Sequence, residues 1–304
     1  MRLAVAATPS VALPTLDWLL TSIHNLELII TRPDRPAGRG KILQQSPVAH
    51  WAIKNQVRMY KPENSRELLE RLENIECVIT IGYGVILPSS VLKIPKFGFT
   101  NIHFSLLPAW RGAAPVQRAI EHGDLVTGVT VFSLDAGMDT GPIYVQKELE
   151  IGEYETAGEL LIRMAHLGPA LIDETLNLIS AGVAPTAQSE IGSSVAKKIS
   201  KNDAKIDWNR SADRVSQQIR AFTPEPGAWT NWREATIQIL RCHIAIGRTN
   251  LLPGEIAIDS GNLLVGCAES TTLQIGELKA AGKREMSAKE WLNGARCNSG
   301  ERFG

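Results

Sequence analysis

Two polar side chains stand two residues apart at the end of an apolar segment. Residues 97–104 (F-G-F-T-N-I-H-F) carry aromatic and β-branched side chains in rough alternation, which predicts a strand that breaks into a loop at Leu107-Pro108. Asn101 and His103 would project from the same face of this strand. An amide can donate a hydrogen bond to a developing oxyanion, and an imidazole can transfer a proton. The same pair could also be an ordinary hydrogen-bonded strand end.

A parallel sheet is expected to position these two side chains. Apolar runs predict strands at residues 3–7, 26–30 and 77–81, and residues 11–23 have the apolar spacing of a helix. A strand, a helix and a second strand in succession form a β-α-β unit, which implies parallel strands. Open α/β sheets place their chemistry at the carboxyl ends of the strands. We therefore expect the amide and the imidazole at that edge of the sheet.

The composition argues against several classes of protein. The chain has 304 residues, of which 44% are hydrophobic and 21% charged, and this is enough for two globular domains. The four cysteines form no C-x-x-C pair, so we expect reduced thiols with neither a disulfide framework nor a metal site. No apolar run approaches the ~18 residues of a membrane helix, which predicts a soluble, cytoplasmic protein. The first turn, Ala7-Thr8-Pro9-Ser10, lacks G-x-G-x-x-G and argues against a nicotinamide cofactor.

Four further segments carry local signals. Residues 31–41 hold two prolines, two glycines and four cations, and are expected to form a long exposed loop. Ser46-Pro47 has the residue types of a helix N-cap and first helical position. An amphipathic helix is expected at residues 65–72. Residues 156–179 begin with a T-x-x-E capping box and have a helical pattern that is interrupted at Gly168-Pro169.

Composition also divides the chain. Residues 183–200 are rich in Ala, Gly, Ser, Pro and Thr, which suits an inter-domain linker. Beyond it, short runs are closely separated by turn residues, which favours a small β-barrel. Residues 1–196 contain 16 Lys and Arg against 20 Asp and Glu, whereas residues 197–304 contain 16 against 12. The mildly basic composition of residues 197–304 weakly indicates a polyanionic partner.

Several motifs resemble those of one enzyme family. N-I-H-F-S-L-L-P, followed by W-R-G-A-A-P and later by D-A-G-M-D-T-G, is similar to the formyltransferases that use 10-formyltetrahydrofolate. The segments R-P-D-R-P-A-G-R-G-K, I-G-Y-G-V-I-L-P and K-I-S-K-N-D-A-K-I-D-W narrow the resemblance to members that act on initiator methionyl-tRNA. The resemblance spans nearly the whole chain. It departs at Ala7, where the family often has glycine, and at Phe104, where it usually has a small residue.

This resemblance implies a fold and a set of partners. It implies an α/β protein with a Rossmann-like, mostly parallel-sheet formyltransferase catalytic domain at residues 1–182 and a linker at residues 183–200. An OB-like, tRNA-binding β-barrel domain would follow at residues 201–304. 10-Formyltetrahydrofolate would be the co-substrate and initiator methionyl-tRNA the acceptor, with no metal and no membrane involved. We expect a monomer.

The chemistry of formyl transfer gives roles to three residues. Attack of an α-amino group on a formyl carbon produces a tetrahedral intermediate with a developing oxyanion, and a proton must move from the amine to the leaving nitrogen. Asn101 could donate to the oxyanion, and His103 could donate when it is protonated. Asp139, which matches the family's catalytic Asp, would favour the imidazolium if it is held nearby. No covalent enzyme intermediate is needed.

Two neighbouring residues have other interpretations. Asp135 lies on the same predicted loop as Asp139, and it fits a turn residue better than a catalyst. Ser105 together with His103 and Asp139 could suggest the acyl-enzyme triad of a hydrolase. No G-x-S-x-G elbow surrounds Ser105, so we do not favour that interpretation.

The resemblance also implies binding residues. The folate site would combine a turn with a loop that lines its pterin end: Ser105, Leu106, Leu107, Pro108, Val85, Ile86, Leu87 and Pro88. On its residues alone, the second stretch could be an ordinary apolar connection. The tRNA would contact a basic loop and the C-terminal part: Arg32, Arg35, Arg39, Lys41, Lys201 and Lys205. Arginine pairs with phosphates and stacks on unpaired bases, although the loop could equally be solvated surface.

Two other functions stay open at this stage. The same N-x-H and Asp combination serves formyl transfer to small amines such as glycinamide ribonucleotide or an amino sugar nucleotide, although the basic loop and the separate C-terminal barrel argue against these acceptors. The chain could also be a catalytically silent tRNA-binding module. The presence of Asn101, His103 and Asp139 together argues against that function.

Overall fold

The computed structural model describes residues 1–37, 42–246 and 250–304, which form two compact units. The first comprises Met1–Pro115, Thr127–Leu149 and Leu161–Ala196, and the second comprises Val116–Val126, Glu150–Leu160 and Lys197–Gly304. The second unit therefore draws two short stretches from the earlier part of the chain. The division into domains at residues 1–182, 183–200 and 201–304 stays a prediction.

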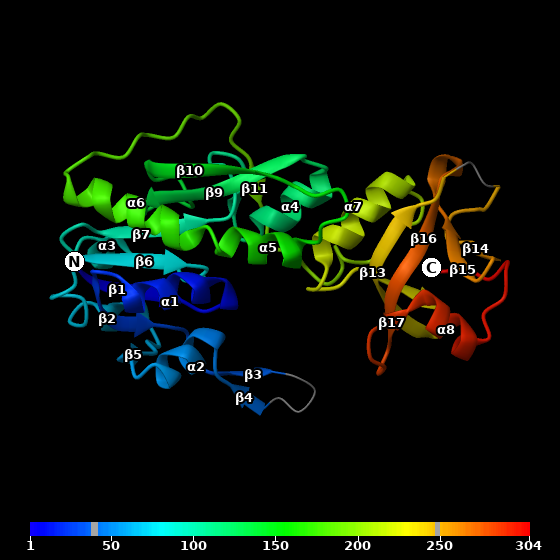
Figure 1. Ribbon diagram of the computed structural model, residues 1–304, viewed down its shortest axis with the longest axis horizontal. Coiled ribbons are helices and arrows are strands. Elements are labelled where there is room, and N and C mark those ends of the chain that lie inside the picture. The colour runs from blue at the N-terminus through cyan, green and yellow to red at the C-terminus, as the bar shows by residue number, and fades with distance from the viewer. Residues whose placement is uncertain (38–41, 247–249) are drawn as a thin grey trace. The chain divides into compact units, whose positions relative to one another are not determined.

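A seven-stranded sheet forms the centre of the first unit (Figure 1). Its order is β10-β9-β7-β6-β1-β2-β5. The strands are β1 (Arg2–Ala7), β2 (Asn25–Ile30), β5 (Met59–Tyr60), β6 (Cys77–Ile81), β7 (Phe99–His103), β9 (Val126–Ser133) and β10 (Ile143–Glu150). β5, β2, β1, β6 and β7 pair in parallel, and β9 pairs with β7 antiparallel. The predicted mostly parallel sheet is confirmed, and its strand order reverses between β1 and β6, where such sheets bind ligands.

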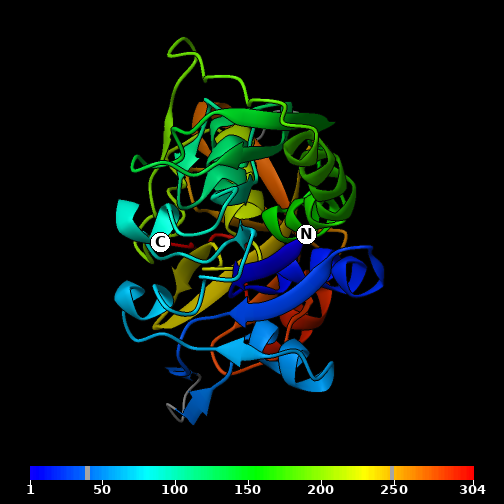
Figure 2. The ribbon, with the colours of Figure 1, turned by 90° about the vertical axis from the view of Figure 1, so that its left-hand side faces the viewer.

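Helices cover both faces of this sheet (Figure 2). The strand β1 is buried on both sides, because Ala4 and Ala6 point to one face and Leu3 and Val5 to the other. The first face packs against the turn η2 (Ser65–Leu68) and helix α3 (Ser89–Leu92). On the other face, α1 (Leu13–Thr21) packs beside α6 (Gly168–Ser180). Gly168 permits this close approach, since a Cβ there would lie 2.3 Å from the Thr15 Oγ1 atom.

Three predicted segments differ in detail from the structure. The predicted loop at residues 31–41 contains strand β3 (Arg35–Ala37), which pairs antiparallel with β4 (Ile42–Gln44). The helix expected at residues 65–72 is only the turn η2, because the chain leaves helical geometry after a single turn. The expected interruption before Pro169 is confirmed, since α5 (Ala157–Ala165) ends before α6 begins. The capping box that opens α5 and the Ser46 cap of α2 (Pro47–Lys54) are also present.

The predicted linker is not free of structure. Strand β11 (Val195–Ala196) pairs in parallel with β8 (Arg111–Gly112), which lies just beyond the end of β7. Upstream, Thr186 forms an antiparallel bridge with Ile143 at the start of β10. Residues 186–196 are therefore anchored to the first unit at both ends.

The second unit is built on a six-stranded antiparallel sheet with the order β12-β13-β16-β15-β14, and β17 pairs with β16. Its strands are β12 (Trp229–Trp232), β13 (Ala235–Ile244), β14 (Ile256–Asp259), β15 (Asn262–Gly266), β16 (Thr272–Ala280) and β17 (Met286–Ser287). The unit also contains α4 (Pro115–His122), apart from its first residue, and α7 (Ala212–Phe222) and α8 (Ala288–Ala295). The sheet curves into a half-barrel, so the predicted fold class is confirmed for both parts of the chain.

Candidate active site

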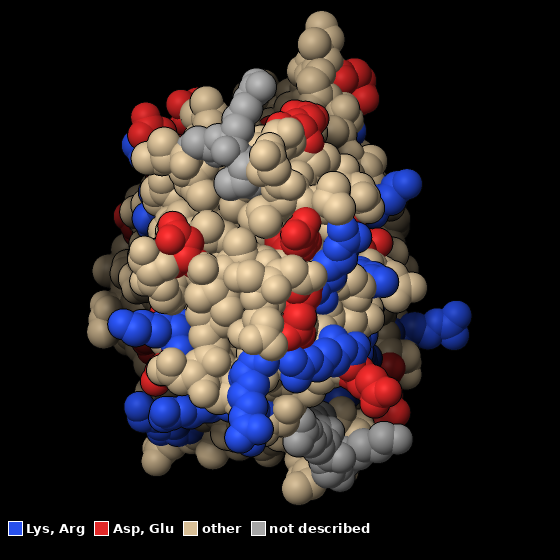
Figure 3. Space-filling view, turned by 90° about the vertical axis from the view of Figure 1, so that its right-hand side faces the viewer, with Lys and Arg blue, Asp and Glu red and all other residues tan. Residues whose placement is uncertain are grey.

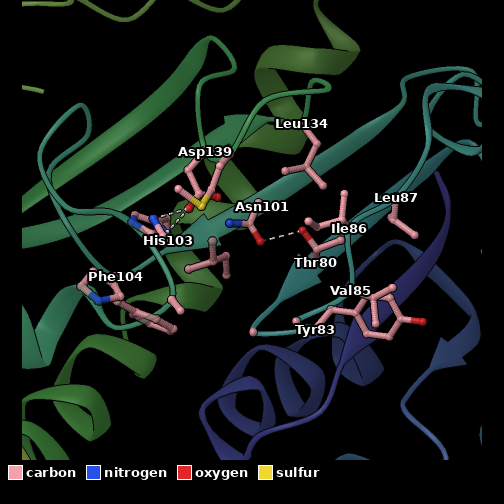
Figure 4. A pocket seen from close by; sticks show the side chains of 17 residues that line it. Thr80, Tyr83, Val85, Ile86, Leu87, Asn101, His103, Phe104, Leu134 and Asp139 are labelled. Atoms are coloured by element: carbon pink, nitrogen blue, oxygen red, sulfur yellow. Dashed lines mark hydrogen bonds and ion pairs between the residues drawn. The ribbon is translucent and has the colours of Figure 1, made fainter. Parts of the chain in front are cut away.

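A cavity opens at the carboxyl ends of β6 and β7, beside the point where the strand order reverses. It has a volume of about 430 Å³, within the range of small-molecule sites. Its lining combines the apolar loop at residues 82–87 with polar side chains from β6, β7 and the loop after β9 (Figure 4). Asn101, His103 and Asp139 all lie in this lining. The three candidate catalytic residues are thus brought together, as the sequence predicts.

Asn101 is oriented by a neighbour on the adjacent strand. Its register partner on β6 is Thr80, whose hydroxyl donates to the Asn101 Oδ1 atom at 2.7 Å. Because the oxygen accepts this hydrogen bond, the Asn101 NH2 group is turned toward His103 and Asp139 (Figure 4). Sequence reasoning missed Thr80, although a threonine within the buried run C-V-I-T-I was a signal that a polar partner would be needed.

His103 is buried, with a side-chain exposure of 6%, and it has two polar neighbours. Its Nε2 atom donates to the Trp110 carbonyl oxygen at 2.9 Å, because a carbonyl can only accept. The Nδ1 atom then faces the Asp139 Oδ2 atom at 3.6 Å. Burial lowers the pKa of the His103 imidazole, and Asp139 and the Trp110 carbonyl, which both raise it, offset this only in part.

The predicted effect of Asp139 is present, but it is not the largest influence on the pKa of His103. Asp139 does favour the imidazolium, but desolvation outweighs it, so the ring of His103 is neutral near pH 7. The neutral ring carries its proton on Nε2, which leaves a lone pair on Nδ1. That lone pair is directed to the side of the ring on which Asp139 lies. His103 is therefore poised to accept a proton in this structure.

Asp139 reaches His103 from the loop between β9 and β10. Its Oδ2 atom accepts a hydrogen bond of 2.8 Å from the Gly112 backbone N–H. Asp139 itself has a φ of 55°, in the left-handed region. Asp135 organises the same loop, because its carboxylate accepts hydrogen bonds from the Gly137 N–H and the Thr140 hydroxyl. The interpretation of Asp135 as a turn residue is confirmed.

The predicted folate residues divide into two groups. Val85, Ile86 and Leu87 line the cavity, whereas Pro88 is the N-cap residue of α3 and is absent from its described lining. The described lining also lacks the whole predicted turn of Ser105, Leu106, Leu107 and Pro108.

Hydrogen bonds within the first unit hold this turn in place, and its role in folate binding stays a prediction. The Ser105 hydroxyl donates to the Ala109 carbonyl at 2.6 Å, and the Leu107 N–H donates to the Thr130 hydroxyl at 3.1 Å. These hydrogen bonds fix the turn that follows the end of β7. Phe104, one of the two departures from the family pattern, does belong to the lining and is 8% exposed.

The predicted tRNA-binding cations lie in different places. Arg32 and Arg35 line a second hollow of about 410 Å³, which shares Tyr83 and Val85 with the first cavity. Arg39 and Lys41 lie outside the described residues. Two further cations, Lys201 and Lys205, belong to the second unit and are exposed, and the Lys205 Nζ atom lies 5.8 Å from the ring centroid of Trp229.

The lowered pKa of His103 leads to a direct test by titration. We expect this imidazole to titrate below the ordinary value of about 6.5, because its burial disfavours the charged ring. NMR of ring-labelled histidine can follow the midpoint, with the signal assigned through its loss in His103→Gln. Asp139→Asn should lower the midpoint further, since it removes the charge that raises the pKa. A His103 midpoint above about 6.5 would contradict this description of the site.

The comparisons with known proteins agree with this arrangement. Residues 1–176 match the model of the formyl transferase family, and residues 198–296 match that of the formyl transferase C-terminal domain. The chain therefore belongs to the formyl transferase family. Among its relatives are the methionyl-tRNA formyltransferases of Salinispora tropica and Thermobifida fusca, each 42% identical. The alignments cover 99% and 100% of this chain, respectively, and 99% of each relative, so within the family the chain groups with the methionyl-tRNA formyltransferases.

Solved structures of related folds are also similar. The methionyl-tRNA formyltransferase from Clostridium thermocellum matches with a TM-score of 0.59 and 20% identity over 82% of this chain and 95% of that one. An N-formyltransferase from Helicobacter canadensis, solved with folinic acid and dTDP-3-aminofucose, has a TM-score of 0.69 and 18% identity over 90% and 98% of the two chains. These likenesses support the fold. In the part of the chain that the structure describes, none of the helices has the length and apolar character of a membrane span.

Proposed function

We propose that this enzyme transfers the formyl group of 10-formyltetrahydrofolate to the α-amino group of the methionyl residue on initiator tRNA. The observation that carries this proposal is the convergence of an amide donor, a neutral imidazole and a carboxylate at one end of an apolar cavity. Formyl transfer requires those three functions, and the full-length relatives bear the name of this activity.

The proposed mechanism is a direct attack without a covalent enzyme intermediate. As the amine attacks the formyl carbon, the carbonyl oxygen becomes an oxyanion that accepts a hydrogen bond from the Asn101 NH2 group. The Nδ1 atom of His103 takes the proton released by the attacking nitrogen. The resulting imidazolium is stabilised by Asp139 and by the Trp110 carbonyl. The same proton then passes to the folate nitrogen as its bond to the formyl carbon breaks.

The apolar part of the cavity suits the pterin ring of the folate. Val85, Ile86, Leu87 and Leu134 form walls on which a planar ring can pack, and the polar groups lie at the other side of the cavity (Figure 4). Ligand sites of this kind combine apolar walls with a few placed polar groups. We propose that residues 85–87 form part of the folate site, and contact of the folate with residues 105–108 stays a prediction.

The acceptor is proposed to bind through cations of both units. Arg32, Arg35, Lys201 and Lys205 are available for phosphate contacts, and the first two lie beside the wall of the cavity. Lys and Arg side chains, with Asp and Glu among them, are exposed in the view of Figure 3. Phosphate contacts from scattered cations give affinity without requiring a uniformly basic surface. A cytoplasmic location and a monomeric state remain predictions.

Binding of the tRNA should therefore weaken steeply with salt. Each neutralised phosphate releases counterions, so affinity measured by fluorescence anisotropy should fall by orders of magnitude between ~50 and ~200 mM salt. Replacing Lys201 and Lys205 together by Ala should reduce the slope of log affinity against log salt by roughly one per lost contact. Lys54→Ala, at an exposed position of α2, is the matched control. A nearly flat salt dependence would exclude these phosphate contacts.

A single assay tests the function as a whole. Labelled formyl from 10-formyltetrahydrofolate is offered to charged initiator tRNA, charged elongator tRNA, glycinamide ribonucleotide and an amino sugar nucleotide. We expect label on the initiator tRNA. Label on a small amine alone would instead support the alternative acceptors, and an absence of transfer together with tRNA binding would support a silent binding module.

A further inference from the structure

The two loops that hold His103 and Asp139 are tied together by one buried arginine and one glutamine. Arg111 lies on β8, next to Trp110 and Gly112, and its side chain is 9% exposed. Its Nε and Nη2 atoms both donate to the Gln188 Oε1 atom, at 3.0 and 2.8 Å. The Gln188 Nε2 atom in turn donates to the backbone carbonyls of Asp139 at 2.8 Å and Gly141 at 2.7 Å.

This pair joins the supports of both catalytic side chains. On one side of Arg111, the Trp110 carbonyl accepts the hydrogen bond from His103, and on the other side, the Gly112 N–H donates to Asp139. Gln188 holds the Asp139 loop from its backbone. The distance of 3.6 Å between His103 and Asp139 thus depends on two loops that Arg111 and Gln188 connect.

The segment that carries Gln188 is held by polar contacts more than by packing. Within residues 186–196, which the structure describes in full, only Ala196 is buried. The Ser194 hydroxyl accepts a hydrogen bond from the Trp110 N–H, and the Arg111 N–H donates to the Ser194 carbonyl. Gly112 is required for the pairing with Ala196, since a Cβ at Gly112 would lie 2.7 Å from the Ala196 carbonyl oxygen.

The burial of Arg111 is difficult to explain by stability alone. A buried guanidinium is costly unless it is paired with a carboxylate in good geometry. Here the near side-chain partners of Arg111 are the neutral Gln188 and Ser193, and the Glu190 carboxylate lies 3.8 Å away on a side chain that is 87% exposed. Such an exposed ion pair contributes little to the stability of the folded protein. A fixed guanidinium does, however, hold a glutamine in one orientation when two of its N–H groups donate to the same amide oxygen, as they do here.

We propose that Arg111 and Gln188 are positioning residues for formyl transfer, which fix the Asp139 loop against the Trp110–Gly112 backbone so that the carboxylate faces His103. This inference rests on the proposed function of the same site. It assigns a role in catalysis to a segment whose composition predicts only a linker. Neither residue contacts the reacting atoms, so both act through Asp139 and the backbone around Trp110.

The test uses the full chain and the variants Gln188→Ala and Gln188→Glu. Glutamate at position 188 can still accept from Arg111 but has no N–H for the carbonyls of Asp139 and Gly141. We expect both variants to lower kcat by up to ~100-fold with little change in KM, since displacement of a catalytic group by about 1 Å has an effect of this size. Ile191→Ala, at a position that is 89% exposed on the same segment, should match the wild type.

The NMR midpoint of His103 distinguishes positioning from general destabilisation. If Asp139 moves away from the ring, the His103 midpoint should fall in the Gln188 variants, as in Asp139→Asn. A folded variant with unchanged kcat, or with lowered kcat and an unchanged midpoint, would overturn the inference. If Gln188→Ala does not fold, Gln188→Glu and Arg111→Lys are measured in its place. If the wild type transfers no formyl group, the proposed function fails, and the midpoint alone decides whether Gln188 positions Asp139.

Discussion

Replacing His103 by alanine should lower kcat/KM for formyl transfer by ~10²–10⁴, the range associated with loss of a general base. The reason is the Nδ1 atom of His103, which the lowered pKa leaves unprotonated near pH 7 and which faces Asp139, another residue of the cavity lining. No other imidazole is present in the described lining to take over the proton. The measurement is the rate of formyl transfer to charged initiator tRNA, at substrate concentrations well below KM.

His103→Gln is the companion variant, because glutamine can still donate to the Trp110 carbonyl but cannot act as a base near pH 7. Both variants should therefore lose activity, while only His103→Ala leaves that buried carbonyl without its donor. His50→Ala, at an exposed position of α2, is the matched control and should retain the wild-type rate. Near-normal turnover of folded His103→Ala would remove His103 from the mechanism.

Replacing Asn101 by alanine should lower kcat by ~10²–10³, as expected for the loss of one oxyanion donor. The Asn101 NH2 group is oriented for this purpose, since its oxygen is held by Thr80. KM for the folate should change much less, because the hydrogen bond strengthens only as charge develops on the formyl oxygen. Single-turnover rates with saturating folate measure this step directly.

Thr80 provides a second test of the same role. Thr80→Val removes the hydroxyl and leaves the Asn101 amide free to turn, so kcat should fall by less than in Asn101→Ala. Thr80→Ser keeps the hydroxyl and should stay close to the wild type. Asn177→Ala, at an exposed position of α6, is the matched control for Asn101→Ala and should retain the wild-type rate. Equal losses in Thr80→Val and Thr80→Ser would show that the hydroxyl does not orient Asn101.

The fold was largely predictable because its signals are local. Four of the five parallel strands were predicted from runs of apolar or alternating residues, and the carboxyl end of β7 placed Asn101 and His103 on one face. Local signals were weaker where tertiary contacts decide the outcome. The pairing of β3 with β4 and the early end of η2 were missed, since the apolar and charged patterns there fit more than one structure.

The folate residues show the same limit at the level of the site. Residues 105–108 follow His103 directly, and the resemblance assigned them to the ligand. The structure directs the Ser105 hydroxyl to the Ala109 carbonyl and includes Phe104 in the described cavity lining, while contact of residues 105–108 with folate stays a prediction. Which side of a turn faces a cavity depends on the strands packed around it, and this information is not contained in four consecutive residues.

The sequence by itself determined which chemical groups are present and the face from which Asn101 and His103 project. Backbone geometry imposes the two-residue alternation of a strand whatever surrounds it. Only the tertiary structure decided the protonation of His103, the orientation of Asn101 and the attachment of Asp139 to residues 186–196. Desolvation and hydrogen bonds depend on neighbours in space, and Thr80, Trp110 and Gln188 come from separate segments that only folding brings to the same site.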